Sequence, residues 1–235
     1  MNLGNYQWQK ILTLLKKLNI NANNKSLYVE AMTHNSYNNE HKLGFTYQRL
    51  EFLGDVIISK IVSCYLFYLK FDEKSMTEIR KAIVNGITLK RASDELSLID
   101  HAFLGRGVNA LTETNKIRED LFESLMGAIY LDQGESKVYE ILKNTIIKYY
   151  NNNDLQDTFD YKTKIQELLQ KNMSSTKSKG KIHYTKEDDG NGNFKSTLYF
   201  GDIKYGTGFG STRKKAENEA ARIAYEKFVK PNINE

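Results

Sequence analysis

The sequence predicts an all-α domain followed by a small α+β domain. Over residues 1–150, apolar residues recur at three- and four-residue spacing, and before residue 180 we find no convincing strand pattern. After that the pattern changes to a short helix, three short strands separated by Gly and Asn, and a final helix. We therefore expect domains at 1–150 and 160–230, joined by a linker at 151–159 that begins with NNND.

The helical domain is predicted from three apolar stripes. One is formed by Leu50, Leu53, Ile57, Ile61 and Cys64. A second helix is indicated by Leu121, Leu125, Ala128 and Ile129. A third runs through Ile141, Leu142, Ile146 and Ile147.

The small domain is predicted as α-β-β-β-α. KTKIQELLQKN forms an amphipathic helix that buries Ile165, Leu168 and Leu169. KIHYTKEDD, NFKSTLYF and DIKYGTG are the expected strands. STRKKAENEAARIAYEKF is the last helix, with Ala216, Ala220, Ala224 and Phe228 on its buried side.

Composition limits the classes of protein that fit. The formal net charge of the 235-residue chain is +5, which favours polyanionic partners without specifying a fold. The single cysteine, Cys64, excludes a disulfide within the chain and is expected in the core. No apolar stretch approaches the ~20 residues that a membrane span needs, and no signal-peptide pattern opens the chain. We expect a cytoplasmic protein that does not bind membranes.

Acidic residues gather on one face of each of two predicted helices. Glu51 and Asp55 are four residues apart, an arrangement that costs a few tenths of a kcal/mol on a helix surface and suggests a cation partner. Asp120 and Glu123 share a face of the second helix, and Gly127 permits close helix approach one turn later. If the helices face each other, the four carboxylates form an all-oxygen site of the type Mg²⁺ prefers. The alternative is two ordinary solvated acid pairs.

Two surfaces of the small domain are suited to RNA. The first helix has a polar stripe fit for 2′-hydroxyls and minor-groove edges, made of Thr163, Gln166, Glu167 and Gln170. The last helix begins with Arg213, Lys214 and Lys215, cations that oppose the helix dipole unless a phosphate binds there. The alternative for both is a solvated face. YGTGFG contains GxGxG without a βαβ unit, so a dinucleotide site is not expected.

Three segments resemble the ribonuclease III family. QRLEFLGD (48–55) resembles its signature, DLFESLMGAIYLD (120–132) its second acidic segment, and THNSY (33–37) its Thr-His-x-Ser motif. The segments occur in the family's order, and the match covers roughly residues 10–230. The resemblance implies a metal-binding catalytic set of Glu51, Asp55, Asp120 and Glu123. It also implies Mg²⁺, with Mn²⁺ as a substitute, and hydrolysis of double-stranded RNA to 5′-phosphate and 3′-hydroxyl ends in ribosomal RNA and mRNA processing.

The same resemblance implies a homodimer, with Phe52 at the dimer contact. Gln48 stands where the family usually has Glu, which leaves the role of residue 48 open. His34 invites assignment as a general base, but a hydrogen-bonded structural histidine is the preferred interpretation.

The α-β-β-β-α segment resembles the double-stranded RNA-binding domain through KTKIQELLQ, YGTGFG and STRKKAENEAA. This implies RNA contacts by the polar stripe of the first helix and, at the last helix, by Ser211, Arg213, Lys214 and Lys215. The family's usual Gly-Pro-x-His turn is replaced by Gly190–Asn193, where Asn193 is the candidate substitute.

Two alternatives to an enzyme remain: a catalytically silent RNA-binding protein on the same fold, and a ribosome-associated scaffold. Scaffold relatives would be expected to lose metal ligands, whereas all four carboxylates are present. The enzyme is therefore the preferred hypothesis.

Overall fold

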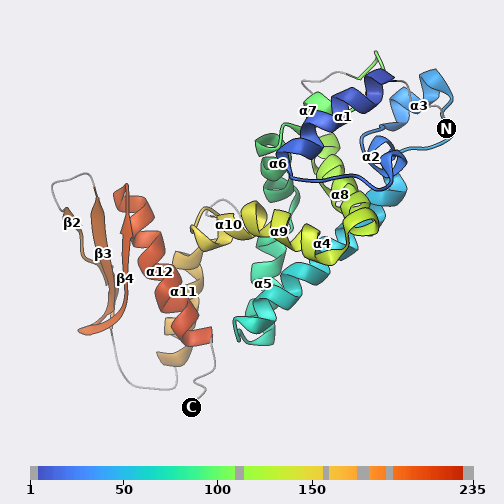
Figure 1. The fold of residues 1–235 in the computed structure, drawn as a ribbon. Coiled ribbons are helices and arrows are strands. Elements are labelled where there is room, and N and C mark those ends of the chain that lie inside the picture. The colour runs from blue at the N-terminus through green and yellow to red at the C-terminus, as the bar shows by residue number, and fades with distance from the viewer. Residues whose placement is uncertain (1–4, 109–113, 156–158, 174–179, 189–192, 230–235) are drawn as a thin grey trace. The chain divides into compact units, whose positions relative to one another are not determined.

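The computed structural model describes residues 5–108, 114–155, 159–173, 180–188 and 193–229 (Figure 1). The chain divides into two compact units. Unit 1 consists of Met1–Cys64 and Ile83–Lys148, and unit 2 of Tyr65–Ala82 and Tyr149–Glu235. No helix in the described ranges is both long and apolar enough to cross a membrane.

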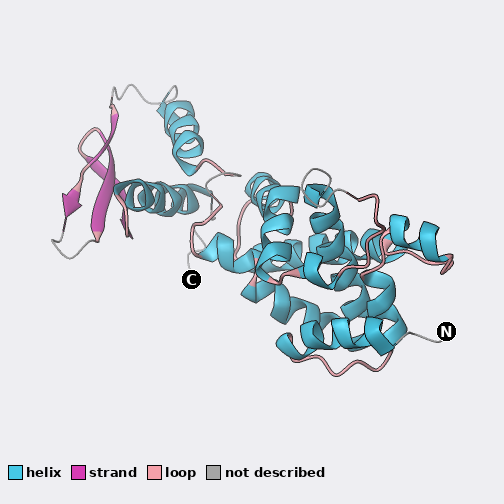
Figure 2. Ribbon diagram, turned by 90° about the horizontal axis from the view of Figure 1, so that it is seen from above, coloured by secondary structure: helices cyan, strands magenta, loops and turns pink. Residues whose placement is uncertain are grey.

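Unit 1 is built from helices (Figure 2). They are α1 (Asn5–Lys17), α2 (Lys25–Ala31), α3 (Asn35–His41), α4 (Gln48–Tyr68), α6 (Gly86–Glu95), α7 (Leu98–His101), α8 (Thr114–Gln133), α9 (Glu135–Asn144) and α10 (Ile146–Asn151), of which α4 and α10 end in unit 2. In the described part of unit 1, the only strand-like pairing is an isolated bridge between Thr33 and Phe103. The prediction of an all-α first domain is confirmed.

Helix α8 forms the centre of unit 1, since every residue from Asp120 to Ile129 is buried. A helix that is buried on all sides must satisfy the polar groups it carries. Ser124 meets this requirement by donating a hydrogen bond from its hydroxyl to the Ala31 carbonyl at 2.7 Å. The predicted apolar residues of α8 therefore lie in the core together with polar ones.

Cys64 was predicted in the core but is exposed. In the second half of α4 the buried residues are Ile57, Ile58, Ile61, Val62 and Leu66, and Ile58, Val62 and Leu66 form a stripe at four-residue spacing. Residue 64 lies two positions from the centre of that stripe, which is the opposite side of a helix with 3.6 residues per turn. The buried face therefore turns away from the predicted stripe before it reaches Cys64.

The third predicted helix is two helices, α9 and α10, because the chain breaks at Thr145. Its backbone has φ −121° and ψ −103°, outside the helical region. Its hydroxyl donates a hydrogen bond to the Ile141 carbonyl at 2.7 Å. Threonine side chains compete in this way with the backbone pattern of a helix. The predicted apolar residues on both sides of the break are nevertheless buried.

Unit 2 contains one antiparallel sheet. Its strands are β1 (Ile182–Tyr184), β2 (Glu187–Asp188), β3 (Phe194–Phe200) and β4 (Ile203–Gly210). β1 and β2 pair with successive parts of β3, and β4 pairs with β3 along its other edge. The first of the three predicted strands is thus interrupted at Thr185, whose N–H donates to the Thr197 carbonyl at 2.9 Å.

Unit 2 contains α5 (Glu73–Ile83), of which only Ile83 belongs to unit 1. It also contains α11 (Tyr161–Met173) and α12 (Arg213–Val229), which lie on one side of the sheet (Figure 1). α12 approaches β4 at two glycines. A Cβ on Gly206 would lie 2.3 Å from the Ala220 oxygen, and one on Gly208 would lie 2.2 Å from the Ala220 nitrogen. The Gly-rich run therefore serves packing against a fully buried alanine stripe. The predicted fold class, all-α followed by α+β, is confirmed.

The predicted linker at 151–159 belongs to unit 2, and its residues 156–158 lie outside the described ranges. Asn153, Leu155 and Phe159 are buried. The Phe159 ring lies against Tyr161, with centroids 4.6 Å apart. The domain boundaries given above remain predictions.

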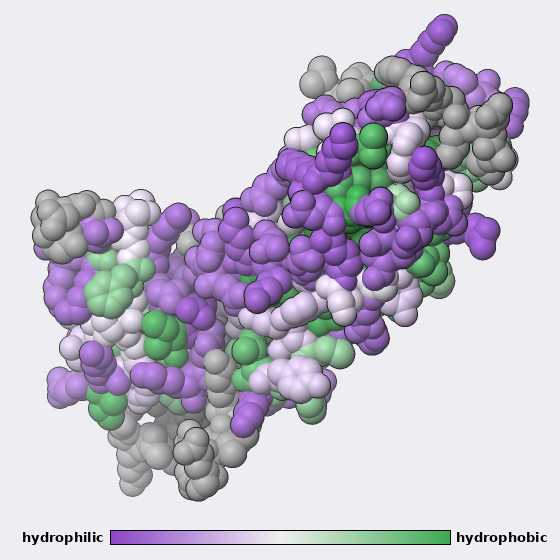
Figure 3. Space-filling model, viewed as in Figure 1, coloured by the Kyte–Doolittle hydropathy of each residue, from purple (hydrophilic) through white to green (hydrophobic). Residues whose placement is uncertain are grey.

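On the face drawn in Figure 3, hydrophilic residues cover most of the described surface, with smaller hydrophobic areas among them.

Candidate metal centre and nucleic-acid interface

Helices α4 and α8 meet at two glycines of unit 1. A Cβ on Gly54 would lie 1.8 Å from the Glu123 backbone oxygen, and one on Gly127 would lie 2.3 Å from the Leu50 oxygen. Real Cβ atoms essentially never approach other atoms so closely. The absence of side chains at both positions therefore permits this crossing, which brings the acidic faces of the helices together.

Three of the four predicted carboxylates converge at this crossing. Glu51 of α4 and Asp120 and Glu123 of α8 each contribute an oxygen, and these atoms lie within 4.8 Å of one another. Asp120 and Glu123 are buried and Glu51 is half-buried. Asp55, the fourth predicted member, is exposed and is not part of this group of three. We call Glu51, Asp120 and Glu123 the carboxylate cluster.

Burial and neighbouring negative charges make Glu51 and Glu123 costly to ionise. Burial is the main cause that raises the pKa of Glu123 to about 8, and negative charges including Asp55 and Asp120 add to it while Lys116 opposes it. Burial and the Asp120 charge likewise raise the pKa of Glu51. A bound cation would reverse both effects. The cluster, buried and made of oxygen ligands only, could hold a hard divalent ion.

Asp120 has two further polar partners. The Tyr47 hydroxyl donates to Asp120 Oδ2 at 3.0 Å, and Lys116 Nζ lies 2.8 Å from Asp120 Oδ1. Burial and the neighbouring Asp120 raise the Tyr47 pKa, so the phenol keeps its proton and remains a donor. The sequence prediction missed both residues. Lys116 precedes Asp120 by one helical turn, so their contact could have been predicted from the spacing along the helix. The contact of Tyr47 with Asp120 depends on the tertiary fold.

Two residues with open roles lie outside the carboxylate cluster. Gln48 is exposed, and its Oε1 is 3.4 Å from the Thr46 hydroxyl. His34 is the N-cap of α3, where its Nδ1 accepts a hydrogen bond from the Ser36 backbone N–H at 3.1 Å. This contact supports the interpretation of His34 as a structural histidine.

Phe52, the predicted dimer contact, is 76% exposed although it lies next to Glu51 in α4. Val56 and Leu131 are also exposed. Beside Phe52 lies a hollow of about 590 Å³, lined by Leu27, Glu30, Gln48, Arg49, Leu50, Phe52, Leu53 and Leu131. An exposed aromatic residue next to a hollow with a partly apolar lining is a typical feature of a protein–protein contact.

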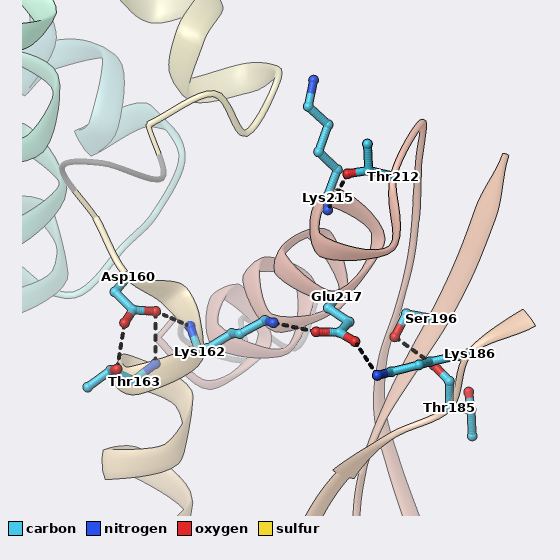
Figure 4. Close-up of polar contacts among 9 residues, drawn as sticks. All are labelled: Asp160, Lys162, Thr163, Thr185, Lys186, Ser196, Thr212, Lys215 and Glu217. Atoms are coloured by element: carbon cyan, nitrogen blue, oxygen red, sulfur yellow. Dashed lines mark hydrogen bonds and ion pairs between the residues drawn. The ribbon is translucent and has the colours of Figure 1, made fainter. Parts of the chain in front are cut away.

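The predicted RNA-facing stripe of α11 is exposed at all four of its positions, Thr163, Gln166, Glu167 and Gln170. Asp160 fixes the start of this helix (Figure 4). Its Oδ1 accepts hydrogen bonds from the backbone N–H groups of Lys162 and Thr163, and its Oδ2 accepts one from the Thr163 hydroxyl at 2.6 Å. This N-cap was not predicted, although Asp three residues before Thr163 is a recognisable signal.

The basic start of α12 is also exposed, at Ser211, Arg213, Lys214 and Lys215. Thr212 Oγ1 accepts a hydrogen bond from the Lys215 backbone N–H at 3.2 Å, which caps one N–H group of the first turn (Figure 4). Among the described ion pairs, none joins Lys214 or Lys215 to a carboxylate. Asn193 is exposed, but Gly190 to Gly192 of the altered turn lie outside the described residues.

Glu217 of α12 joins three segments of unit 2. It pairs with Lys162 at the start of α11 and with Lys186 between β1 and β2 (Figure 4). Burial works against the charge of Glu217, yet the hydrogen bonds and charges of the two lysines lower its pKa. Glu217 thus holds two cations that sequence spacing did not connect.

Comparisons with known proteins agree with this architecture. Residues 24–150 match a family described as Ribonuclease-III-like, and residues 161–228 match the Double-stranded RNA binding motif. A Ribonuclease 3 of Mycoplasmoides gallisepticum is 45% identical over 96% of this chain, which spans only 34% of that relative. One of Spiroplasma citri is 38% identical over 94% of this chain and 91% of its own length.

A solved structure also resembles part of this chain. The nuclease domain of ribonuclease III from Campylobacter jejuni is 30% identical with a TM-score of 0.54, and the match covers 59% of this chain and 96% of that domain. Three observations point to the same family: the helical fold, the small mixed domain, and relatives that match over almost the whole chain. The chain belongs to the ribonuclease III family.

Proposed function

We propose that this chain is an endoribonuclease that hydrolyses phosphodiester bonds in double-stranded RNA with the help of Mg²⁺ and leaves 5′-phosphate and 3′-hydroxyl ends. The observation that carries the proposal is the carboxylate cluster: three acidic side chains whose oxygens lie within 4.8 Å, two of them buried. A fold gains no stability from crowding buried like charges, so a cation is the expected partner. Mn²⁺ is the expected substitute, because it takes similar oxygen ligands.

The residues of the site have distinct parts in the proposed reaction. Glu51, Asp120 and Glu123 would hold the ion, with Asp55 near them on the solvent side. When bound, the ion would activate a water molecule and stabilise charge on a phosphoryl oxygen. Tyr47 orients Asp120 through the 3.0 Å hydrogen bond to Oδ2. Glu123, with its raised pKa, would release its proton as the ion binds.

Unit 2 would supply most of the affinity for RNA. We assign the contacts to Thr163, Gln166, Glu167, Gln170, Asn193, Ser211, Arg213, Lys214 and Lys215, all of which are exposed. Short polar groups on α11 suit the minor groove of an A-form duplex, and the basic start of α12 suits phosphate. Processing of ribosomal RNA and mRNA precursors is the proposed role of the cleavage.

We also propose a homodimer formed through Phe52 and the adjacent hollow. In a two-fold dimer each copy presents the same patch, so the Phe52 of one copy can fill the hollow of the other. The Campylobacter jejuni nuclease domain has a region involved in dimer formation, which is flexible in that protein. Phe52→Glu should give monomers in analytical ultracentrifugation. Phe67→Glu is the control, since Phe67 is 66% exposed on the same helix and should leave the dimer intact.

One assay tests the proposed activity. The protein is incubated with long double-stranded RNA in Mg²⁺ and in EDTA, with single-stranded RNA and duplex DNA as control substrates. Cleavage that requires Mg²⁺ and the RNA duplex is expected. Binding without cleavage would favour the silent RNA-binding alternative, and activation of an inert wild type by Gln48→Glu would identify the position responsible.

A further inference from the structure

Lys116 is a basic residue that contacts the carboxylate cluster. It lies in the first part of α8, one turn before Asp120, and its Nζ is 2.8 Å from Asp120 Oδ1 and 3.5 Å from Glu119 Oε1. The lysine side chain is 65% exposed, whereas the side chain of Asp120 is only 10% exposed. The ammonium group therefore reaches from the surface to a buried member of the carboxylate cluster.

The position of this ammonium group matters because of the charges around it. Glu51 and Glu123 each have an oxygen within 4.8 Å of one on Asp120. A positive charge beside Asp120 thus lowers the repulsion within the whole cluster. A divalent ion in the same place would meet that positive charge at short range, where the repulsion between +1 and +2 charges is strong even in water.

We propose that Lys116 is a tethered counter-ion of the carboxylate cluster, which a divalent ion must displace from Asp120. This inference rests on the metal site proposed above and adds a residue that tunes it. Lys116 stabilises the protein without metal and weakens the binding of metal. Its removal therefore acts in opposite directions on the two quantities, whereas the loss of an ordinary surface ion pair would lower stability alone.

The test compares Lys116→Gln with Lys90→Gln in the full chain. Lys90 and Asp94 form a matched pair, because they too are four residues apart on a helix of unit 1, with Nζ 2.8 Å from the carboxylate. Binding of Mg²⁺ and Mn²⁺ is measured by calorimetry without RNA, and thermal unfolding is measured in EDTA and in Mg²⁺. Lys116→Arg, which keeps the charge, should behave like the wild type.

We expect Lys116→Gln to bind the ions roughly tenfold more tightly, to unfold at a lower temperature in EDTA, and to gain more from added Mg²⁺ than the wild type. Lys90→Gln should leave ion affinity unchanged. Unchanged or weaker ion binding by Lys116→Gln overturns the inference while the metal site stands. If the wild type binds no ion and Glu123→Gln makes no difference, the metal site itself is wrong. If Lys116→Gln does not fold, Lys116→Met, which keeps the aliphatic stem, is measured in its place.

Discussion

Glu123 and Glu217 are carboxylates in opposite electrostatic surroundings. Glu123 is buried among other acids in unit 1, and its pKa is raised to about 8. Glu217 lies between two lysines in unit 2, and its pKa is lowered. The charges around Glu123 are mainly negative, so the carboxylate cluster could hold an external cation. Glu217 is already neutralised within the protein, so the phosphate contacts proposed for unit 2 are assigned to other cations, Lys214 and Lys215.

The largest effect is expected from Glu123→Gln, which removes a charge from the carboxylate cluster and keeps its shape. Turnover on double-stranded RNA should fall by at least about a hundredfold, because even the loss of groups that only support metal ligands costs roughly 10–100-fold. Affinity for RNA, measured by gel shift, should stay at the wild-type level. Cleavage at the wild-type rate in Mg²⁺ would refute the assignment of Glu123 to the metal site.

The second-largest effect is expected from substitution of the glycines at the α4–α8 contact and at the β4–α12 contact. Gly54→Ala places a Cβ against the Glu123 backbone oxygen, and separating α4 from α8 should cost about 1–3 kcal/mol of unfolding free energy and weaken metal binding. Gly208→Ala should instead separate β4 from α12 and weaken RNA binding at unchanged metal affinity. Gly107→Ala is the control, since its Cβ would meet nothing within 4 Å. Equal loss of both activities in each variant would show that the regions are not independent.

Removal of two cations from the start of α12 should have a smaller effect. Lys214→Ala with Lys215→Ala should weaken binding of duplex RNA and reduce the salt slope of the binding constant by about one unit for each phosphate interaction that is removed. Cleavage at saturating RNA and low salt should persist, because the carboxylate cluster is intact. Lys143→Ala, at an exposed position of α9, is the control. Wild-type affinity of the double variant at physiological salt would mean that this helix start is only a solvated surface.

The smallest effect is expected from Glu217→Gln and depends on pH. The folded-state pKa of Glu217 is lowered, so its charge stabilises the fold above its unfolded pKa of ~4.3, and this contribution is lost as the pH falls through the folded value. The variant should be less stable by no more than about 1 kcal/mol at pH 7, since the lysines are partly exposed. The difference between the two thermal unfolding curves should shrink in acid. A difference that grows in acid would contradict this interpretation.

Helix periodicity predicted which acids share a face, since that depends only on spacing along one helix. It therefore assigned Glu51 to one face and Asp120 with Glu123 to another. It could not predict how closely the two helices approach each other or where each carboxylate group lies at their crossing. Asp55, at helical spacing from Glu51, consequently remains outside the group of three oxygens. Tyr47 joins Asp120 across 73 positions in sequence, a contact that no local pattern carries.

The exposure of whole helix faces was easier to predict than the burial of single residues. The polar stripe of α11 and the basic start of α12 lie on the surface as expected, because an unpacked helix face is defined by its own residues. The failures at Cys64 and Thr145 have the opposite origin. Whether Cys64 is buried depends on which neighbours cover the end of α4, and the structure leaves it exposed. At Thr145 the helix ends, although the apolar pattern of the sequence continues.

The two glycines at the α4–α8 crossing also determine how the chain can vary. Neither Gly54 nor Gly127 offers a functional group, yet every replacement adds at least one carbon that would lie against the backbone of the other helix. A deep mutational scan for cleavage should therefore find these positions as intolerant as the acids themselves, whereas a search by chemical labelling of reactive side chains would pass over both. Redesign of the proposed metal site should leave the crossing untouched and vary exposed positions such as Asp55 instead.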